Sequence, residues 1–291
     1  MAHAQIRMLW VALIALTLAM VFLSDGATWL IEYPEAWVLP ITSWLNMAMD
    51  WTVAFFGPAF KAFSALMDIP MSAVRDFLQW LPWSVTLVLL TLAAYAVSGV
   101  SLALFTCLSV FYMVVIGYWP ESMNSLSLVV ISVPMAVGSG FALGSLAFFS
   151  DRAERIIKPV MDLLQTVPAF AYLLPILLLF GFGPVVGLIA SILYAFPPTV
   201  RNTMLGLRRV PDEVIEAGLM SGATGAQLFW RVRVPSAQRQ ILLGVNQTTM
   251  AAFSMVIIAS VIGGTADIGW EVLSTMRKAE FGESLLAGLV I

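Results

Sequence analysis

Long uncharged stretches dominate the pattern of hydrophobic and polar positions along the chain. A helix needs about 20 apolar residues to cross roughly 30 Å of hydrocarbon, so the length of each stretch limits how many times it can cross the membrane. The stretches are 8–23, 77–120, 122–150, 163–200 and 240–266. The second is long enough for two helices with a turn at 98–99, and glycines at 181–184 divide the fourth. The pattern therefore predicts seven crossings and, at 289–291, the start of an eighth.

The basic residues predict the orientation of these crossings, because lysine and arginine collect on the cytoplasmic side of a membrane. With the N-terminus inside, the segments 151–160 and 201–240 are also inside. Of the 14 basic residues, 10 then lie inside, and the net charge is about +4 inside and −7 outside. The opposite orientation reverses this asymmetry, so we expect a cytoplasmic N-terminus.

The segment 24–80 is external in this topology and carries tryptophans at a seven-residue spacing, Trp37, Trp44 and Trp51. One interpretation is an amphipathic helix in the outer interface, with tryptophans at the depth of the headgroups. The other is a docking surface for an external partner. Three prolines are expected to break the segment into pieces: Pro40, Pro58 and Pro70.

Composition agrees with a membrane protein. Of 291 residues, 60% are hydrophobic and 11% are charged, against roughly 25% charged in a soluble domain. These values exclude a soluble globular domain, a disordered chain and a nucleic-acid binder. We expect an all-α polytopic protein in three parts. They are 1–80, an N-terminal helix with the external segment; 81–120, two peripheral crossings; and 121–291, the core.

Few residues are available for catalysis or metal binding. Cys107 is the single cysteine and His3 the single histidine, so neither an intrachain disulfide nor a histidine metal site is expected. The sequence contains no P-loop motif. If ATP drives this protein, another subunit must bind it, and the chain itself is not expected to be an enzyme.

The longest charged segment, 201–240, predicts a hairpin of two short helices. Pro211 precedes two acidic residues, which suits the first turn of a helix, and Gly222 is suited to end it. Thr224 and Gln227 have the spacing of a capping box that begins a second helix, which Pro235 ends. From architecture alone, a plain connecting loop remains the alternative.

Part of this hairpin resembles the EAA signature of ABC importer permeases, E-A-A-x3-G-x9-I-x-L-P. The matching residues are Glu216, Ala217, Gly218, Gly222, Val232, Val234 and Pro235. Gly218 replaces an alanine of the motif, and the two valines replace isoleucine and leucine. The resemblance implies that the segment forms coupling helices, which sit in a cleft of the ATP-hydrolysing subunit. Three nearby arginines either pair with that subunit or only supply inside-positive charge: Arg231, Arg233 and Arg239.

Two further stretches, 165–175 and 244–260, look like permeases for glycine betaine, proline betaine and choline. This resemblance implies a type I importer permease fold in a bacterial inner membrane. It also implies a second copy of the chain, two ATPase subunits that bind ATP and Mg²⁺, and an external substrate-binding protein. The segment 263–270 departs from the family pattern, so glycine betaine, choline, carnitine and trimethylamine N-oxide all remain candidate solutes.

A permanent positive charge on such solutes favours aromatic contacts, each worth about 0.5–2 kcal/mol. The aromatic candidates for the path are Phe170, Tyr172, Tyr194 and Phe253. Packing against lipid or core is the alternative for each. Asn246 and Gln247, at the inner end of the predicted helix 240–266, either line the exit or bond neighbouring helices.

Small residues at four-residue spacing, Ala136, Gly140 and Gly144, predict close helix packing in lipid. An ion-coupled secondary transporter is the alternative function. It requires intramembrane acids or inverted repeats, and neither is evident in the predicted spans. A membrane scaffold or sensor is a third possibility.

Overall fold

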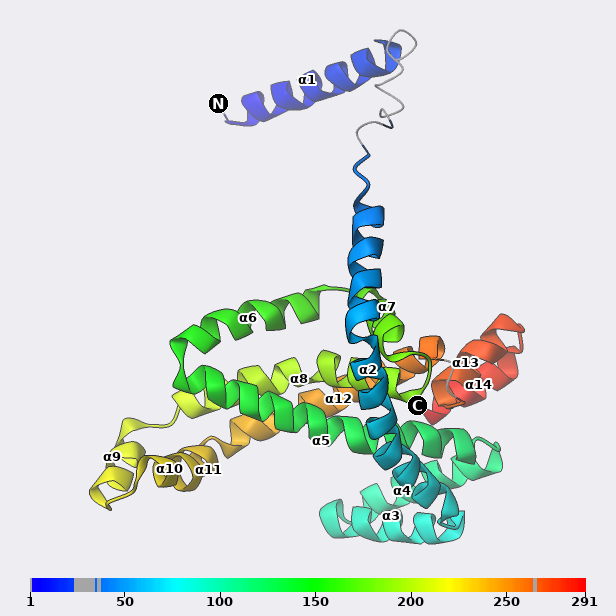
Figure 1. Cartoon of the computed structure of the whole chain (residues 1–291), viewed down its shortest axis with the longest axis vertical. Helices are drawn as coiled ribbons and strands as arrows, with labels where there is room; N and C mark the ends of the chain where they lie inside the picture. Colours follow the sequence, from blue (N-terminus) through cyan, green and yellow to red (C-terminus); the bar gives the residue numbers. More distant parts are fainter. Residues whose placement is uncertain (1, 24–34, 36–37, 264–265) are drawn as a thin grey trace. The chain divides into compact units, whose positions relative to one another are not determined.

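The computed structural model describes residues 2–23, 35, 38–263 and 266–291. Every regular element in these residues is a helix (Figure 1). In chain order the helices are α1 (Ala2–Leu23), α2 (Ile41–Trp80), α3 (Trp83–Ser98), α4 (Val100–Val115), α5 (Trp119–Phe149), α6 (Asp151–Thr166), α7 (Ala169–Phe180), α8 (Pro184–Arg208), α9 (Asp212–Met220), α10 (Gly225–Gln227), a π-helical turn (Leu228–Arg233), α11 (Val234–Ser236), α12 (Gln238–Gly263), α13 (Ile268–Arg277) and α14 (Phe281–Val290).

The chain divides into two compact units, Met1–Thr52 and Val53–Ile291, and the division falls within α2. The first unit holds α1 and the first turns of α2. The side chains of residues 5–22 in α1 are exposed, and the helix is long and apolar enough to cross a bilayer. Trp44 and Trp51 of the predicted tryptophan row are exposed, whereas Trp37 lies outside the described residues.

Among the described residues, five helices are long and apolar enough to span a membrane: α1, α2, α5, α8 and α12. The number is six if the bent pair α6–α7 forms one span. Helices α3 and α4 form the predicted hairpin, with its turn at Gly99, where φ is 76°. Each has 16 residues, which is shorter than a full crossing. The five long apolar helices confirm the prediction of a polytopic helical membrane protein.

The core of the second unit is the packing of α8 between α5 and α12. A Cβ atom added to Gly140 would lie 2.7 Å from Thr199 Cβ, and one added to Gly144 would lie 2.7 Å from the Val200 carbonyl oxygen. On the other side, a Cβ at Gly244 would lie 3.1 Å from the backbone of Thr199. The predicted small-residue stripe on α5 therefore permits contact at backbone distance, as expected where helices pack in lipid.

Helices α6 and α7 are separated at Val167 and Pro168 and meet at an angle of 106°. Val167 is extended, as a residue before proline prefers, so α6 ends there. The sequence predicts one helix over 163–180, and the structure divides it instead. The next predicted turn is present, because Gly181 and Gly183 have φ values of 84° and 132°.

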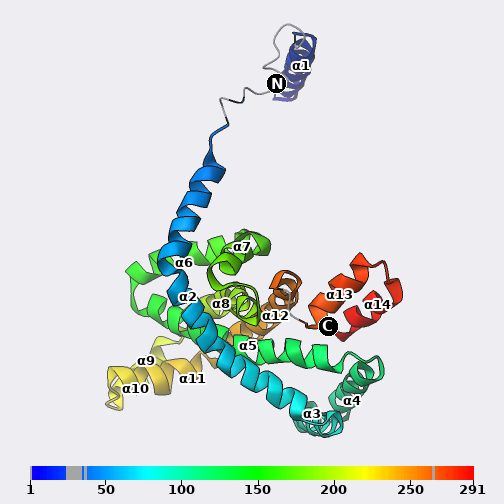
Figure 2. The same cartoon turned by 45° about the vertical axis from the view of Figure 1, so that its right-hand side comes forward.

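The prediction that prolines break the segment 24–80 is wrong for Pro58 and Pro70, which both lie inside the continuous helix α2. Proline removes one helical hydrogen bond, and tertiary contacts can offset that loss. In the second unit, Met71 of α2 is buried against side chains of α5, α8 and α12, including Leu128, Leu188 and Val256. This part of α2 crosses α5 rather than running beside it (Figures 1 and 2).

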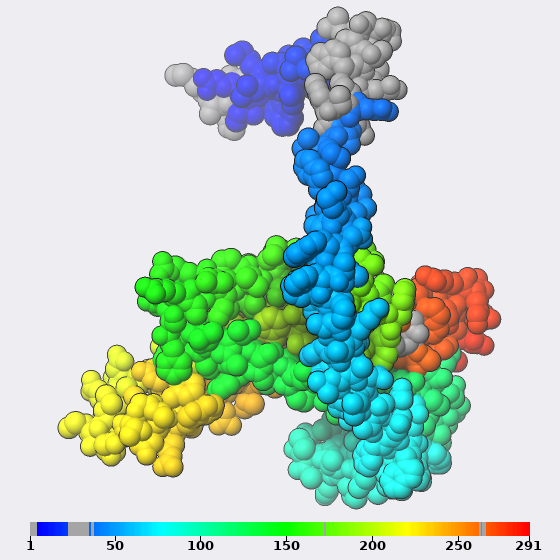
Figure 3. Space-filling model, in the orientation of Figure 1, coloured from blue at the N-terminus to red at the C-terminus, as the bar shows by residue number. Residues whose placement is uncertain are grey.

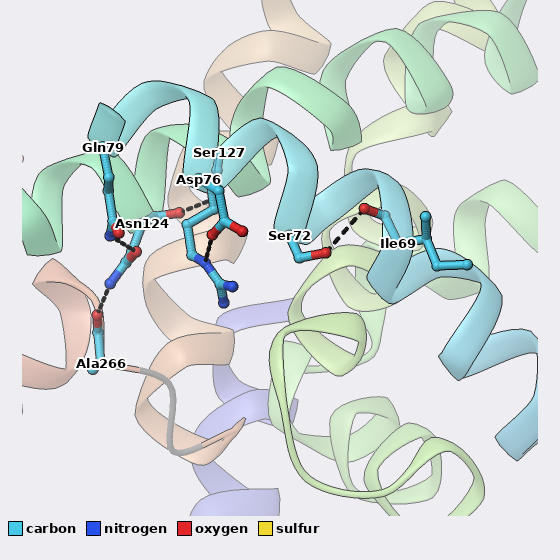
Figure 4. Close-up of polar contacts among 8 residues, drawn as sticks. Ile69, Ser72, Asp76, Gln79, Asn124, Ser127 and Ala266 are labelled. Atoms are coloured by element: carbon cyan, nitrogen blue, oxygen red, sulfur yellow. Dashed lines mark hydrogen bonds and ion pairs between the residues drawn. The ribbon is translucent and has the colours of Figure 1, made fainter. Parts of the chain in front are cut away.

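The C-terminal end of α2 is joined to the core by a short chain of amides. Gln79 Nε2 donates to Asn124 Oδ1 at 2.8 Å, and Asn124 Nδ2 donates to the carbonyl oxygen of Ala266 (Figure 4). Ser64 Oγ, farther back on α2, lies 3.3 Å from the carbonyl oxygen of Phe180. Helix α2 therefore contacts the ends of α5 and α7 and the segment before α13, all at the end of the core opposite the α8–α12 connection.

We predict that Gly144→Ala destabilises the chain by about 2 kcal/mol, because the added methyl group meets backbone atoms of α8. Gly138→Ala, on the same helix, is the matched control, since nothing lies within 4 Å of a Cβ at that position. The control should be neutral or stabilising by up to about 1 kcal/mol. Thermal unfolding of the purified variants in detergent measures both, and equal midpoints would contradict the packing described.

Candidate functional site: the coupling hairpin and the α6–α8–α12 face

The segment between α8 and α12 is shorter than predicted. The sequence assigns 201–240 to this loop, but α8 continues to Arg208 and α12 begins at Gln238. Only 209–237 therefore connects the two helices. These residues form a hairpin that extends beyond the ends of α5 and α8 (Figure 3). The difference arises because charge alone does not end a helix, so Arg201 and Arg208 both belong to α8.

The first arm of the hairpin is α9, and its ends agree with the sequence. Pro211 occupies the N-cap, with Asp212 and Glu213 in the first turn. Gly222 follows the helix with φ 76°, a left-handed conformation that favours glycine. The predicted capping box is also present. Thr224 Oγ1 accepts from the Gln227 amide at 3.4 Å, and Gln227 Oε1 accepts from the Thr224 amide at 2.9 Å.

The EAA residues lie on both arms of the hairpin and differ in exposure. Glu216, Ala217 and Gly222 are exposed, and Gly218 is half-buried against the second arm. A Cβ at Gly218 would lie 2.9 Å from Leu228 Cδ1 and 3.2 Å from Val232 Cγ2. The glycine that replaces the motif's alanine therefore leaves room for the side chains of Leu228 and Val232. Pro235 is exposed in α11.

The second arm is fixed to α5 by aromatic contacts and to α8 by a hydrogen bond, and no local sequence pattern predicts either. Phe229 packs against Phe149 with ring centroids 5.0 Å apart, and Trp230 packs against Phe141 at 5.8 Å. Arg233 lies over the Phe148 ring at 5.1 Å and donates to the Leu207 carbonyl oxygen at 3.4 Å. Arg233 therefore has a role within the chain, in addition to its positive charge.

Hydrogen bonds join α8 and α12 along the half of their interface nearest the hairpin. Thr199 Oγ1 and Thr248 Oγ1 are 2.7 Å apart, and both residues are fully buried. Asn202 Nδ2 donates to Gln247 Oε1 at 3.1 Å, and Gln240 Nε2 donates to Asn202 Oδ1 at 2.5 Å. Gln247 thus bonds the neighbouring helix, while Asn246 is exposed.

The predicted path residues are not all brought together. Tyr194 is half-buried beside Leu173 and Met255, and Phe170 is exposed at the start of α7. Phe253 lies elsewhere, in an apolar cavity of about 280 Å³ that α3, α4, α5 and α13 also line. The side chain of Tyr172 lies outside the described residues.

Two ion pairs connect α6 with α8. Arg208 Nη1 donates to Glu154 Oε1 at 2.8 Å, and Lys158 Nζ lies 2.5 Å from the same oxygen. Arg201 pairs with Asp162 farther from the hairpin. No group of three or more potential metal ligands occurs among the residues that the structure describes.

Residues 135–291 match the family described as the binding-protein-dependent transport system inner membrane component. The chain is 35% identical to the glycine betaine/proline betaine transport system permease protein ProW of Escherichia coli (strain K12), over 91% of this chain and 78% of ProW. It is 34% identical to the glycine betaine/carnitine transport permease protein GbuB of Listeria monocytogenes serotype 1/2a (strain 10403S), over 89% and 92%. A solved amino acid ABC transporter crystallised with histidines has a similar fold, with a TM-score of 0.50 and 20% identity, over 62% of this chain and 90% of that one.

The chain therefore belongs to the binding-protein-dependent family of ABC importer permeases, which are membrane components rather than enzymes. This membership supports the importer class over an ion-coupled secondary transporter. It also means that the chain works with ATPase and substrate-binding partners.

We predict that Arg233→Ala loosens the hairpin, because it removes a cation–π contact and a bond to the Leu207 carbonyl. The two together are worth about 1 kcal/mol, so hydrogen exchange in 228–237 should accelerate about fivefold. Arg231→Ala, at an exposed neighbouring position, is the control and should leave exchange in this segment unchanged. Mass spectrometry of the exchanged protein measures both, and equal rates in the two variants would refute the anchoring role.

Proposed function

We propose that the chain is the membrane-spanning subunit of an ATP-driven importer for quaternary ammonium or related methylated-amine solutes. The observation that carries this proposal is the projecting hairpin 209–237 (Figure 3). Four of its EAA residues are exposed: Glu216, Ala217, Gly222 and Pro235. In this role Glu216, Ala217, Gly222 and Pro235 lie at the contact with the ATPase, and Gly218 lets the two arms pack closely behind them.

The surface of the hairpin supports a docking role. Leu219 is 54% exposed and Met220 is 91% exposed at the end of α9. Large apolar side chains exposed side by side at the tip of a projecting element mark a protein contact. The aromatic anchor of the second arm fixes the hairpin to α5, and the hydrogen bond from Arg233 to Leu207 joins it to α8. Movement of the tip is therefore transmitted to those helices.

The partners and orientation follow from this role. The hairpin and the N-terminus face the cytoplasm, where two ATPase subunits bind ATP and Mg²⁺. Two copies of the chain enclose the path, because each carries one hairpin and the ATPases act as a pair. An external binding protein delivers the solute at the opposite end. Phe170, Tyr172, Tyr194, Asn246, Gln247 and Phe253 remain candidates for contact with the solute.

Transport by the reconstituted assembly tests the proposal. The chain is placed in liposomes with its P-loop ATPase and external binding protein, and uptake of radiolabelled glycine betaine is followed. We expect uptake to require ATP inside the liposomes and to be insensitive to collapse of the proton and sodium gradients. Uptake driven by an ion gradient without ATP would instead establish the secondary transporter.

We predict that Gly222→Val uncouples hydrolysis from uptake, because a β-branched residue is strongly disfavoured at φ 76° and distorts the end of α9. Gly225→Val is the matched control, since Gly225 has an ordinary φ and open space at its Cβ. Solute moved per ATP hydrolysed is the measurement. A normal ratio in Gly222→Val would remove the coupling role from this turn.

A further inference from the structure

The ion pair Arg201–Asp162 joins α8 to α6 on an exposed face of the core, away from the hairpin end of α8. Helix α8 is a candidate membrane span, and its charged residues are Arg201 and, seven residues later, Arg208. Seven residues of helix place Arg201 about 10 Å from the hairpin end of α8. Asp162 lies in α6, eight residues after Glu154 and one turn before the helix ends at Thr166. Beside Asp162, Met161 is buried against Ala195 and Val200 of α8.

The two ion pairs between these helices differ in accessibility. The Glu154 side chain, which pairs with Arg208 and Lys158, is 13% exposed. In the deeper pair, the side chains of Arg201 and Asp162 are 46% and 66% exposed. The basic partners are exposed to a similar extent in both pairs, at 39% for Arg208 and 52% for Lys158, so the difference lies in the carboxylates. The Glu154 carboxylate is shielded by protein, whereas the Asp162 carboxylate is open to a small molecule.

An open charged pair at this depth requires a wet surface. Ionisable side chains within membrane spans face the bundle interior or a water-filled cavity, because hydrocarbon does not solvate them. The polar side chains at the same level agree with this, since Asn202, adjacent to Arg201, bonds Gln247 of α12. Tyr194 lies two turns from Arg201 on the same face of α8.

We propose that Arg201 and Asp162 form a binding site for the zwitterionic solute on its path through the membrane. This inference rests on the proposed function. A guanidinium binds a carboxylate through two parallel hydrogen bonds, so Arg201 binds the carboxylate of a betaine. A quaternary ammonium has no hydrogen to donate, and the Asp162 carboxylate balances its charge across a short distance. The solute carboxylate therefore takes the place of Asp162 beside Arg201, and the solute ammonium takes the place of Arg201 beside Asp162. The ion pair re-forms when the solute leaves.

Uptake by the reconstituted importer provides the first test. Arg201→Gln should lower glycine betaine uptake at least about tenfold, because a charge-assisted bond to the solute is lost. ATPase stimulation by the loaded binding protein should stay within about twofold of wild type. Arg201→Lys keeps the charge without the paired donors and should be intermediate, with a raised KM. Arg208→Gln is the control, because it breaks the pair with the shielded Glu154 carboxylate on the same helices and should leave the KM unchanged.

Solute protection of a nearby cysteine provides the second test. Thr166→Cys, one turn from Asp162 and exposed, is made with Cys107→Ser and treated with a trimethylammonium methanethiosulfonate. We expect labelling that saturating glycine betaine slows at least about fivefold, and no protection of Arg155→Cys, two turns from Asp162. Absent labelling or absent protection at Thr166→Cys would overturn the site, as would wild-type uptake in Arg201→Gln. Failure of the wild-type chain to take up any zwitterion would instead overturn the proposed function.

Discussion

The fold depends on the distance at which three helices can approach in lipid. Lipid tails are as apolar as leucine, so helix association relies on van der Waals packing and hydrogen bonds rather than on the hydrophobic effect. Gly140 and Gly144 let α5 contact the backbone of α8, and Gly244 does the same for α12. The Thr199–Thr248 hydrogen bond lies at this contact. The hairpin, α6 and the second half of α2 are all attached to this packed trio.

Local sequence rules predicted the features that depend on a few adjacent residues. The turns at Gly99 and 181–184 and the capping box at Thr224 follow from backbone preferences, and the structure contains them. The continuity of α2 through Pro70 was not predictable in this way. The hydrogen bond lost at this proline is offset by burial of Met71 against helices more than fifty residues away in the sequence, and such contacts leave no local pattern.

The candidate site also combines features that adjacent residues predict with contacts between distant segments that they do not predict. The EAA residues are recognisable because their spacing is short and regular. The aromatic anchor joins 141–149 to 229–233, and nothing in either segment alone indicates the pairing. The end of α8 was misplaced because the uncharged run stops at Val200 while the helix continues. That error also hid the position of Arg201, which the sequence assigned to a loop and the structure places within a candidate span.

The exposed end of α9 has a consequence for how the protein is made. Leu219 and Met220 project from a hairpin that the chain itself leaves uncovered on that side. A newly inserted chain without its partner therefore exposes two adjacent apolar side chains to water. Covering them in the assembly stabilises the subunit, so we expect the newly made chain to be less stable alone than in its complex.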